Sequence, residues 1–117
     1  YGAMVHVARE AAEVLSREGV ELEIIDLRTL LPIDEETILE SVKKTSKALV
    51  LHEATYTDGI GGEIAARITE KAFEYLDGPV VRLTAPDTPV PFSPPLEEAF
   101  LPNKDKLLEK ARWLAAY

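Results

Sequence analysis

Cysteine is absent from this chain, which excludes disulfides, thiolate metal sites and a cysteine nucleophile. Histidine occurs only at His6 and His52, and a lone histidine is weak evidence for a metal site. No serine lies in a G-x-S-x-G setting, so we expect no hydrolase of that type. No apolar run approaches the roughly 18 residues of a membrane span and no signal peptide precedes Tyr1, so we expect no membrane contact and a cytoplasmic protein.

Basic residues are the scarcer charged class, with 13 Lys and Arg against 21 Asp and Glu and a formal net charge of −8. Such a chain repels a phosphate backbone, so we expect no nucleic-acid partner. A basic protein partner is more plausible. For the charge by itself, the favoured interpretation is that it merely keeps the domain soluble.

The length of 117 residues and the 46% hydrophobic content suit a single domain spanning residues 1–117 with a real core. Hydrophobic spacing, caps and glycine stops predict alternating helices and strands. The expected helices cover 4–18, 34–44, 60–76 and a terminal stretch, with Asp34 as the cap of the second and Asn103 as the cap of the last. The expected strands cover 20–26, 48–52 and 79–84. This alternation predicts an α/β fold, a three-layer α/β/α sandwich around a mostly parallel sheet.

Residues 86–102 hold six of the eight prolines. A Pro-rich stretch is usually a semi-rigid linker. Here, however, two phenylalanines and three aliphatic residues are interspersed with the prolines, and large apolar residues are unusual in a solvated linker. We therefore expect an ordered loop that lies against a hydrophobic surface.

A glycine cluster, Gly59, Gly61 and Gly62, stands between an expected strand and an expected helix, where a phosphate-binding loop would lie. Ile64 stands where a dinucleotide fingerprint needs Gly or Ala, and Glu63 would oppose an anion. The favoured interpretation is a tight helix entry that allows close packing of helix on sheet.

His52 is the strongest polar candidate because it ends an expected strand, at the edge where open α/β sheets place ligands. A hydrogen-bonded strand-end or interface histidine is the more common case. Asp77, in the turn Leu76-Asp77-Gly78-Pro79, has two open interpretations from the residues alone: an ordinary turn residue or a docking carboxylate.

Six segments together identify a resemblance: 1–6, 26–32, 51–54, 59–65, 76–79 and 87–92. In that order they resemble the C-terminal domain of the β subunit of thiamine-diphosphate-dependent 2-oxo acid dehydrogenases, such as those for pyruvate or branched-chain 2-oxo acids. This domain has the fold of the transketolase C-terminal domain. The resemblance covers essentially the whole chain. The family domain opens with a strand that runs into Tyr1-Gly2, so the resemblance implies that this first strand is truncated here.

The resemblance implies an assembly role within an oxidoreductase. The parent enzyme decarboxylates a 2-oxo acid oxidatively and transfers the acyl group to lipoyl. It binds thiamine diphosphate and magnesium between an α subunit and the N-terminal domain of a β subunit, so this domain is expected to hold no catalytic, cofactor-binding or metal residue. Its implied partners are the α subunit and a second β subunit in a heterotetramer, and the small basic subunit-binding domain of the acyltransferase.

By motif match, the carboxylate of Asp77 and the terminal carboxylate of Tyr117 would bind that acyltransferase domain through charge-assisted hydrogen bonds. His52 and the glycines Gly59, Gly61 and Gly62 would lie near a subunit interface. The aromatic and aliphatic groups of the last helix should pack it down and fix the direction of the carboxylate.

Two other hypotheses remain. One is a stand-alone acidic interaction module that has the domain without the chemistry. The other is the C-terminal domain of a transketolase or deoxyxylulose-phosphate synthase relative. The Pro-Asp-Thr-Pro-Val-Pro-Phe segment and the Tyr117 ending favour the dehydrogenase β subunit. The sequence does not indicate which 2-oxo acid is the substrate.

Overall fold

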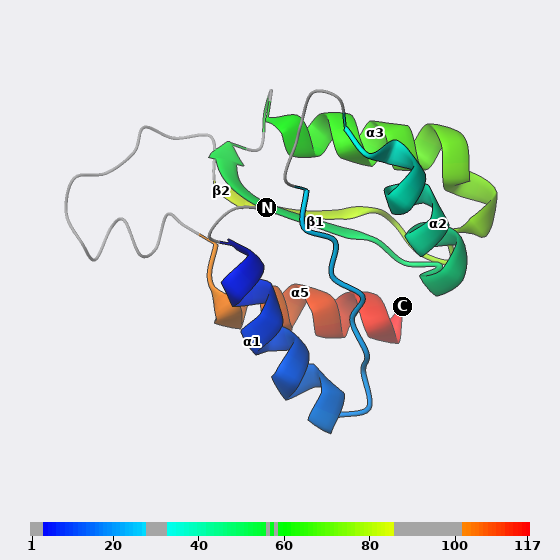
Figure 1. Ribbon diagram of the computed structural model, residues 1–117. Coiled ribbons are helices and arrows are strands. Elements are labelled where there is room, and N and C mark those ends of the chain that lie inside the picture. The colour runs from blue at the N-terminus through cyan, green and yellow to red at the C-terminus, as the bar shows by residue number, and fades with distance from the viewer. Residues whose placement is uncertain (1–3, 28–32, 56, 58, 86–101) are drawn as a thin grey trace.

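The computed structural model describes residues 4–27, 33–55, 57, 59–85 and 102–117 (Figure 1). Helices and strands alternate along most of this chain, as the sequence predicts. The elements are the helices α1 (Met4–Arg17), α2 (Glu35–Thr45), α3 (Ile60–Ala72) and α5 (Lys104–Ala116), the 3-10 helix η1 (Phe73–Tyr75), and the strands β1 (Leu49–Thr55) and β2 (Val81–Ala85). No helix of the described residues is long and apolar enough to cross a membrane.

Side-chain caps fix the starts of two helices. Asp34 precedes α2 and accepts a hydrogen bond from the backbone N–H of Thr37 at 3.2 Å. Asn103 precedes α5 and accepts one from the backbone N–H of Lys106 at 2.9 Å. Both residues satisfy a donor that the first helical turn leaves unpaired. The predicted cap at Asn103 and the predicted cap at Asp34 are confirmed.

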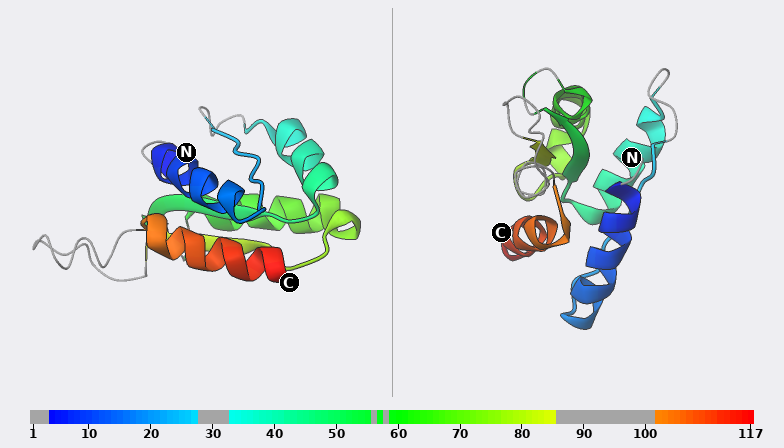
Figure 2. Two further views of the ribbon diagram at one scale, coloured as in Figure 1. Left: turned by 90° about the horizontal axis from the view of Figure 1, so that it is seen from below. Right: turned by 90° about the vertical axis from the view of Figure 1, so that its left-hand side faces the viewer.

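The two strands run parallel, with Leu49 opposite Val81 and Leu51 opposite Leu83. Because parallel neighbours need a crossover, α3 connects the end of β1 to the start of β2. Figure 1 shows α2 and α3 on one face of the strands and α1 and α5 on the other. The right-hand view of Figure 2 shows α1 and α2 on one side of the picture and α3 and α5 on the other.

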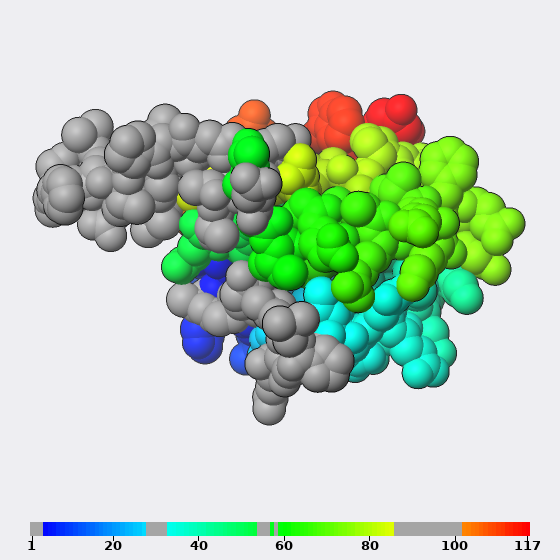
Figure 3. All heavy atoms as spheres, turned by 90° about the horizontal axis from the view of Figure 1, so that it is seen from above, coloured from blue at the N-terminus to red at the C-terminus, as the bar shows by residue number. Residues whose placement is uncertain are grey.

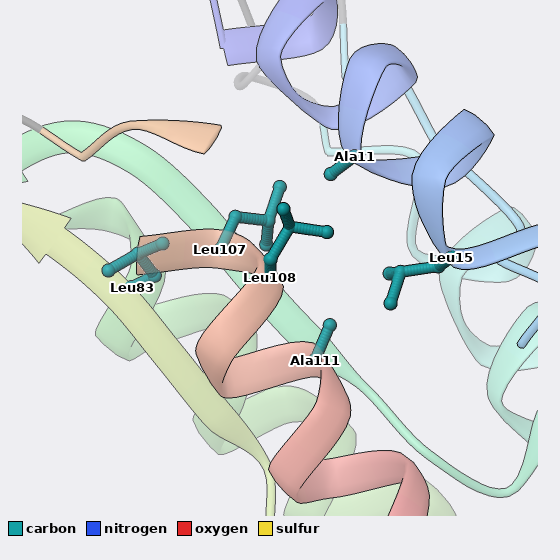
Figure 4. Close-up of a cluster of buried hydrophobic side chains, with 6 residues drawn as sticks. All are labelled: Ala11, Leu15, Leu83, Leu107, Leu108 and Ala111. Atoms are coloured by element: carbon teal, nitrogen blue, oxygen red, sulfur yellow. The ribbon is translucent and has the colours of Figure 1, made fainter. Parts of the chain in front are cut away.

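Two hydrophobic clusters fill the spaces between the helix layers and the strands. The cluster in Figure 4 lies under α1 and α5 and consists of Ala11, Leu15, Leu83, Leu107, Leu108 and Ala111. The second lies under α2 and α3 and consists of Ile38, Val42, Ile64, Ile68 and Ala72. Along β1, Leu49 and Leu51 pack on the first cluster and Val50 on the second. This alternation confirms an α/β sandwich whose strands are covered on both faces.

The predicted strand at residues 20–26 is wrong: residues 20–27 belong to no strand of the described chain. A ladder requires neighbouring backbones about 4.8 Å apart. Instead, a cavity of about 510 Å³ is lined on one side by residues 19–25 and 27 and on the other by residues 49–51 of β1. The segment therefore stands off from the edge of β1 that it would have to pair with.

The predicted ordered loop at 86–102 falls almost entirely outside the described residues. Only Pro102 is described, and it is buried directly before Asn103, the cap of α5.

Candidate docking site

Asp77 lies in the turn that follows η1, and two contacts tie this turn to the connection between α2 and β1. Its backbone N–H donates to the carbonyl of Ser46 at 3.0 Å. Its carboxylate Oδ1 accepts from Lys47 Nζ at 2.6 Å. The Asp77 side chain is 61% exposed and that of Lys47 is 26% exposed, so a partner in solution can reach the carboxylate while the lysine is held against the fold.

Ser46 makes this contact possible by a left-handed backbone, with φ 65°, at the C-cap of α2. Its own N–H donates to the carbonyl of Val42 at 2.8 Å. The chain thereby turns sharply out of α2, and the carbonyl of Ser46 is left to accept the N–H of Asp77.

Tyr117 lies against the same turn. A methyl group added to Gly78 would stand 3.1 Å from Cδ1 of Tyr117, so the ring packs directly over the residue that follows Asp77. The backbone N–H of Tyr117 donates to Leu114 at 3.2 Å and continues α5 to the end. In Figure 3 the red end of α5 lies beside the yellow-green residues that follow α3. The structure thus brings Asp77 and Tyr117 to one surface from positions 40 residues apart.

Trp113 extends this surface. Its ring centroid lies 5.5 Å from that of Tyr117, at an interplanar angle of 57°. Trp113 is 54% exposed and Tyr117 is 67% exposed. The aliphatic residues of α5 are the ones that are buried, so the expectation that aromatic groups hold the helix down is wrong for Trp113. We call Asp77, Gly78, Trp113 and Tyr117 the candidate docking surface.

His52 is only 1% exposed and lies inside the chain. Its Nε2 accepts a hydrogen bond from the backbone N–H of Gly61 at 3.0 Å. A methyl group on Gly61 would stand 2.1 Å from that nitrogen, so only glycine allows α3 to approach β1 this closely. Close helix–sheet packing at Gly61, the favoured interpretation of the glycine cluster, is confirmed.

The start of α3 is poorly suited to an anion. The N–H of Gly61 is already donated to His52, and Glu63 in the first turn pairs with Arg67 at 2.8 Å. Gly59 and Gly62 are half-buried, and Gly59 adopts an extended conformation before the helix. These glycines and His52 stay a predicted interface region.

Ion pairs join neighbouring helices on the surface. Glu35 of α2 contacts Arg67 at 3.2 Å and also pairs with Lys71, both on α3. These cations lower the pKa of Glu35, chiefly through its hydrogen bond from Lys71. Within the described residues no group of three or more His, Asp or Glu side chains could hold a metal ion. The described donors therefore do not fit a magnesium–diphosphate site.

Comparison with known proteins defines the class of this domain. Residues 1–107 match the family described as "Transketolase, C-terminal domain". The chain belongs to this family. A solved structure titled "Split gene transketolase, inactive beta4 tetramer" superposes with a TM-score of 0.81 and 26% sequence identity, over 97% of this chain and 35% of that one.

Two curated relatives from Bacillus subtilis (strain 168) define more closely which proteins this chain resembles. The β subunit of acetoin:2,6-dichlorophenolindophenol oxidoreductase is 46% identical over 107 residues, 92% of this chain and 31% of that protein. The β subunit of the pyruvate dehydrogenase E1 component is 46% identical over 112 residues, 96% of this chain and 34% of that protein. The chain thus spans about a third of the length of these relatives, which are subunits of oxidoreductases, and is similar to their C-terminal region.

Proposed function

We propose that this chain is the C-terminal assembly and docking domain of the β subunit of a thiamine-diphosphate-dependent 2-oxo acid or acetoin dehydrogenase. In that enzyme the cofactor and its magnesium are held by other parts of the assembly. The domain packs against the α subunit and a second β subunit. The similarity of nearly the whole chain to two such β subunits supports this proposal, and so does the tetramer named for the structural relative.

The docking role rests on one observation: Asp77 and the end of α5 share an exposed surface. A carboxylate beside two exposed aromatic rings suits a small basic partner, because aromatic groups supply contact area and carboxylates accept charge-assisted hydrogen bonds. We propose that this partner is the subunit-binding domain of the acyltransferase. Trp113 and Tyr117 would give it an apolar contact, and Asp77 with the terminal carboxylate would fix its orientation.

The start of α3 is the proposed contact with neighbouring subunits. Gly59 and Gly62 have no side chain and lie at a half-buried surface. Another backbone could approach closely there once the end of the flexible Arg82 side chain, which lies over Gly62, moves aside. His52 would act there indirectly, since it is buried and holds Gly61 in place.

The test is the affinity of the complete heterotetramer for the isolated subunit-binding domain, measured by calorimetric titration. Asp77→Asn should weaken docking by roughly tenfold or more, because a hydrogen bond to a charged group contributes about 1.5–3 kcal/mol. Glu74→Gln removes the same charge from an exposed neighbouring position and should leave docking nearly unchanged. Decarboxylation by the tetramer should be unaffected in both. Equal docking by wild type and Asp77→Asn at low salt would contradict the role.

A further inference from the structure

Tyr75, the last residue of η1, holds a lysine over its ring. Nζ of Lys43, in the last turn of α2, lies 5.3 Å from the ring centroid. A cation within about 6 Å of an aromatic ring is attracted by the negative face of that ring. Tyr75 is 42% exposed and Lys43 is exposed too, so a partner in solution can reach this contact. The ring of Tyr75 is therefore a cation site on the surface of the domain.

Tyr75 and Asp77 lie on the same side of the chain. Leu76, which separates them, has an extended backbone with φ −80° and ψ 137°, and it packs on the cluster under α2 and α3. In an extended segment, residues two apart lie on one side, opposite the residue between them. Tyr75 and Asp77 are both exposed, as this geometry requires. Their Cα atoms are about 6.5–7 Å apart in such a segment, so the two residues are neighbours on the surface.

A lysine from one short segment occupies each of these two groups. Lys43 lies over the ring of Tyr75, and Lys47 contacts Oδ1 of Asp77 at 2.6 Å. The two lysines are four residues apart, on either side of the left-handed turn at Ser46. Figure 1 shows the end of α2 and the segment after α3 at the same end of the molecule. The chain thus places two of its own cations on two adjacent sites, and a docking partner has to replace them.

We propose that Tyr75 determines which partner docks, as a second cation site beside Asp77. The inference rests on the proposed docking function and extends the candidate docking surface towards α2. The partner would present two basic residues three or four positions apart on a helix, because such residues are about 5–6 Å apart at Cβ and match the spacing of Tyr75 and Asp77. One of them would displace Lys47 from Asp77, and the other would displace Lys43 from Tyr75.

The two sites select a partner by the spacing of its charges and not only by its net charge. At Tyr75 an arginine is favoured, because a planar guanidinium stacks on an aromatic ring and is less strongly hydrated than an ammonium group. A partner with a single basic residue, or with two that lie far apart, would fill one site and leave a lysine of this chain in the other. Such a partner would gain only part of the available binding.

The first test measures docking of the isolated subunit-binding domain to the complete heterotetramer. Tyr75→Leu should weaken docking about two- to fivefold, the loss expected for an exposed cation–π contact, and Tyr75→Phe should keep the affinity because it keeps the ring. Lys43→Gln should strengthen docking in the wild type but not in Tyr75→Leu. Lys44→Gln removes the same charge from the next residue, which pairs with Glu23 at 2.8 Å, and measures the effect of charge alone. Equal gains from Lys43→Gln in both backgrounds would overturn the proposal.

The second test changes the partner. Each Lys and Arg of the subunit-binding domain is replaced by Gln in turn, and its coupling to Tyr75→Leu and to Asp77→Asn is measured. One basic residue should couple to Tyr75, and a different one, three or four positions away, should couple to Asp77. Coupling of a single residue to both, or of none to Tyr75, would overturn the proposal. If Asp77→Asn still weakens docking in that case, the docking function stands and only the second cation site fails. If neither substitution changes the affinity, the docking function itself fails.

Discussion

At the scale of single residues, the contact between His52 and Gly61 explains why a histidine and a glycine stand at these positions. Nε2 of His52 accepts the amide proton of Gly61, so this nitrogen carries no proton and the imidazole is neutral with its proton on Nδ1. The contact fixes the first turn of α3 against β1. The histidine that looked most like a ligand is therefore a structural one within this chain.

Gly61→Ala should destabilise the domain by about 1–3 kcal/mol, the usual cost of overpacking, because the new methyl group would stand 2.1 Å from Nε2 of His52. Gly62→Ala is the matched control. Its methyl group would meet the end of the flexible Arg82 side chain at 3.3 Å, which can move. Urea denaturation of both variants measures the difference, and equal stabilities would contradict the packing described here.

Lys47→Gln should strengthen docking of a basic domain by a few-fold. Lys47 now neutralises Asp77 at 2.6 Å, and a basic partner has to compete with it for the carboxylate. The cost in stability should stay below about 1 kcal/mol, the usual limit for an exposed pair. Lys44→Gln removes a charge that pairs with Glu23 instead and should not change affinity. Unchanged docking in Lys47→Gln would argue against competition at Asp77.

The motif around Asp77 could be found in the sequence, but its neighbours could not. Lys47 lies 30 residues earlier in a connection with no distinctive composition. Its contact with Asp77 depends on the left-handed turn at Ser46, for which serine is an uncommon choice. Long-range contacts of this kind follow from packing rather than from local pattern.

At the scale of elements, local signals predicted the helices better than the strands. Asp34 and Asn103 cap their helices as expected because capping involves only three or four neighbouring residues. Residues 20–26 have the right hydrophobic period for a strand, yet a strand also needs a partner that the period does not specify. The cavity beside β1 is the physical reason why this expectation was wrong.

Asn103→Ala should lower the free energy of unfolding by about 1 kcal/mol, because the amide of Lys106 loses its acceptor at the start of α5. Lys104→Ala, at an exposed position in the same turn, serves as the control and should change stability little. Thermal or urea unfolding measures both. A cap variant as stable as the control would mean that α5 does not depend on this hydrogen bond.

The pair between Glu18 and Arg112 ties the end of α1 to α5 through two hydrogen bonds of 2.9 and 2.7 Å. The hydrogen bond from Arg112 lowers the pKa of Glu18. The pair's contribution to stability is therefore fully present above the ordinary glutamate pKa. It is lost as the pH falls through the lowered pKa that Glu18 has in the folded protein. Compared with Glu18→Gln, the wild type should be more stable at neutral pH and equally stable in strong acid. Melting temperatures of both proteins across this range measure the convergence, and a constant difference would contradict it.

At the scale of the whole molecule, the candidate docking surface joins the turn after η1 to the end of α5. The cavity beside β1 reaches towards this surface, because Lys47, Leu114 and Ala115 are among the residues that line it. Net charge of −8 would steer a basic partner towards the domain, so docking should weaken as salt rises.

The most direct test of the central claim is a double-mutant cycle on docking affinity, with the complete heterotetramer and the acyltransferase's subunit-binding domain. The two changes are Asp77→Asn and a short Gly-Ser extension after Tyr117, which moves the terminal carboxylate. If both groups bind one partner at one surface, each change should weaken docking and the two losses should not add. Strictly additive losses, or an extension without effect, would contradict a docking site shared by Asp77 and the end of α5.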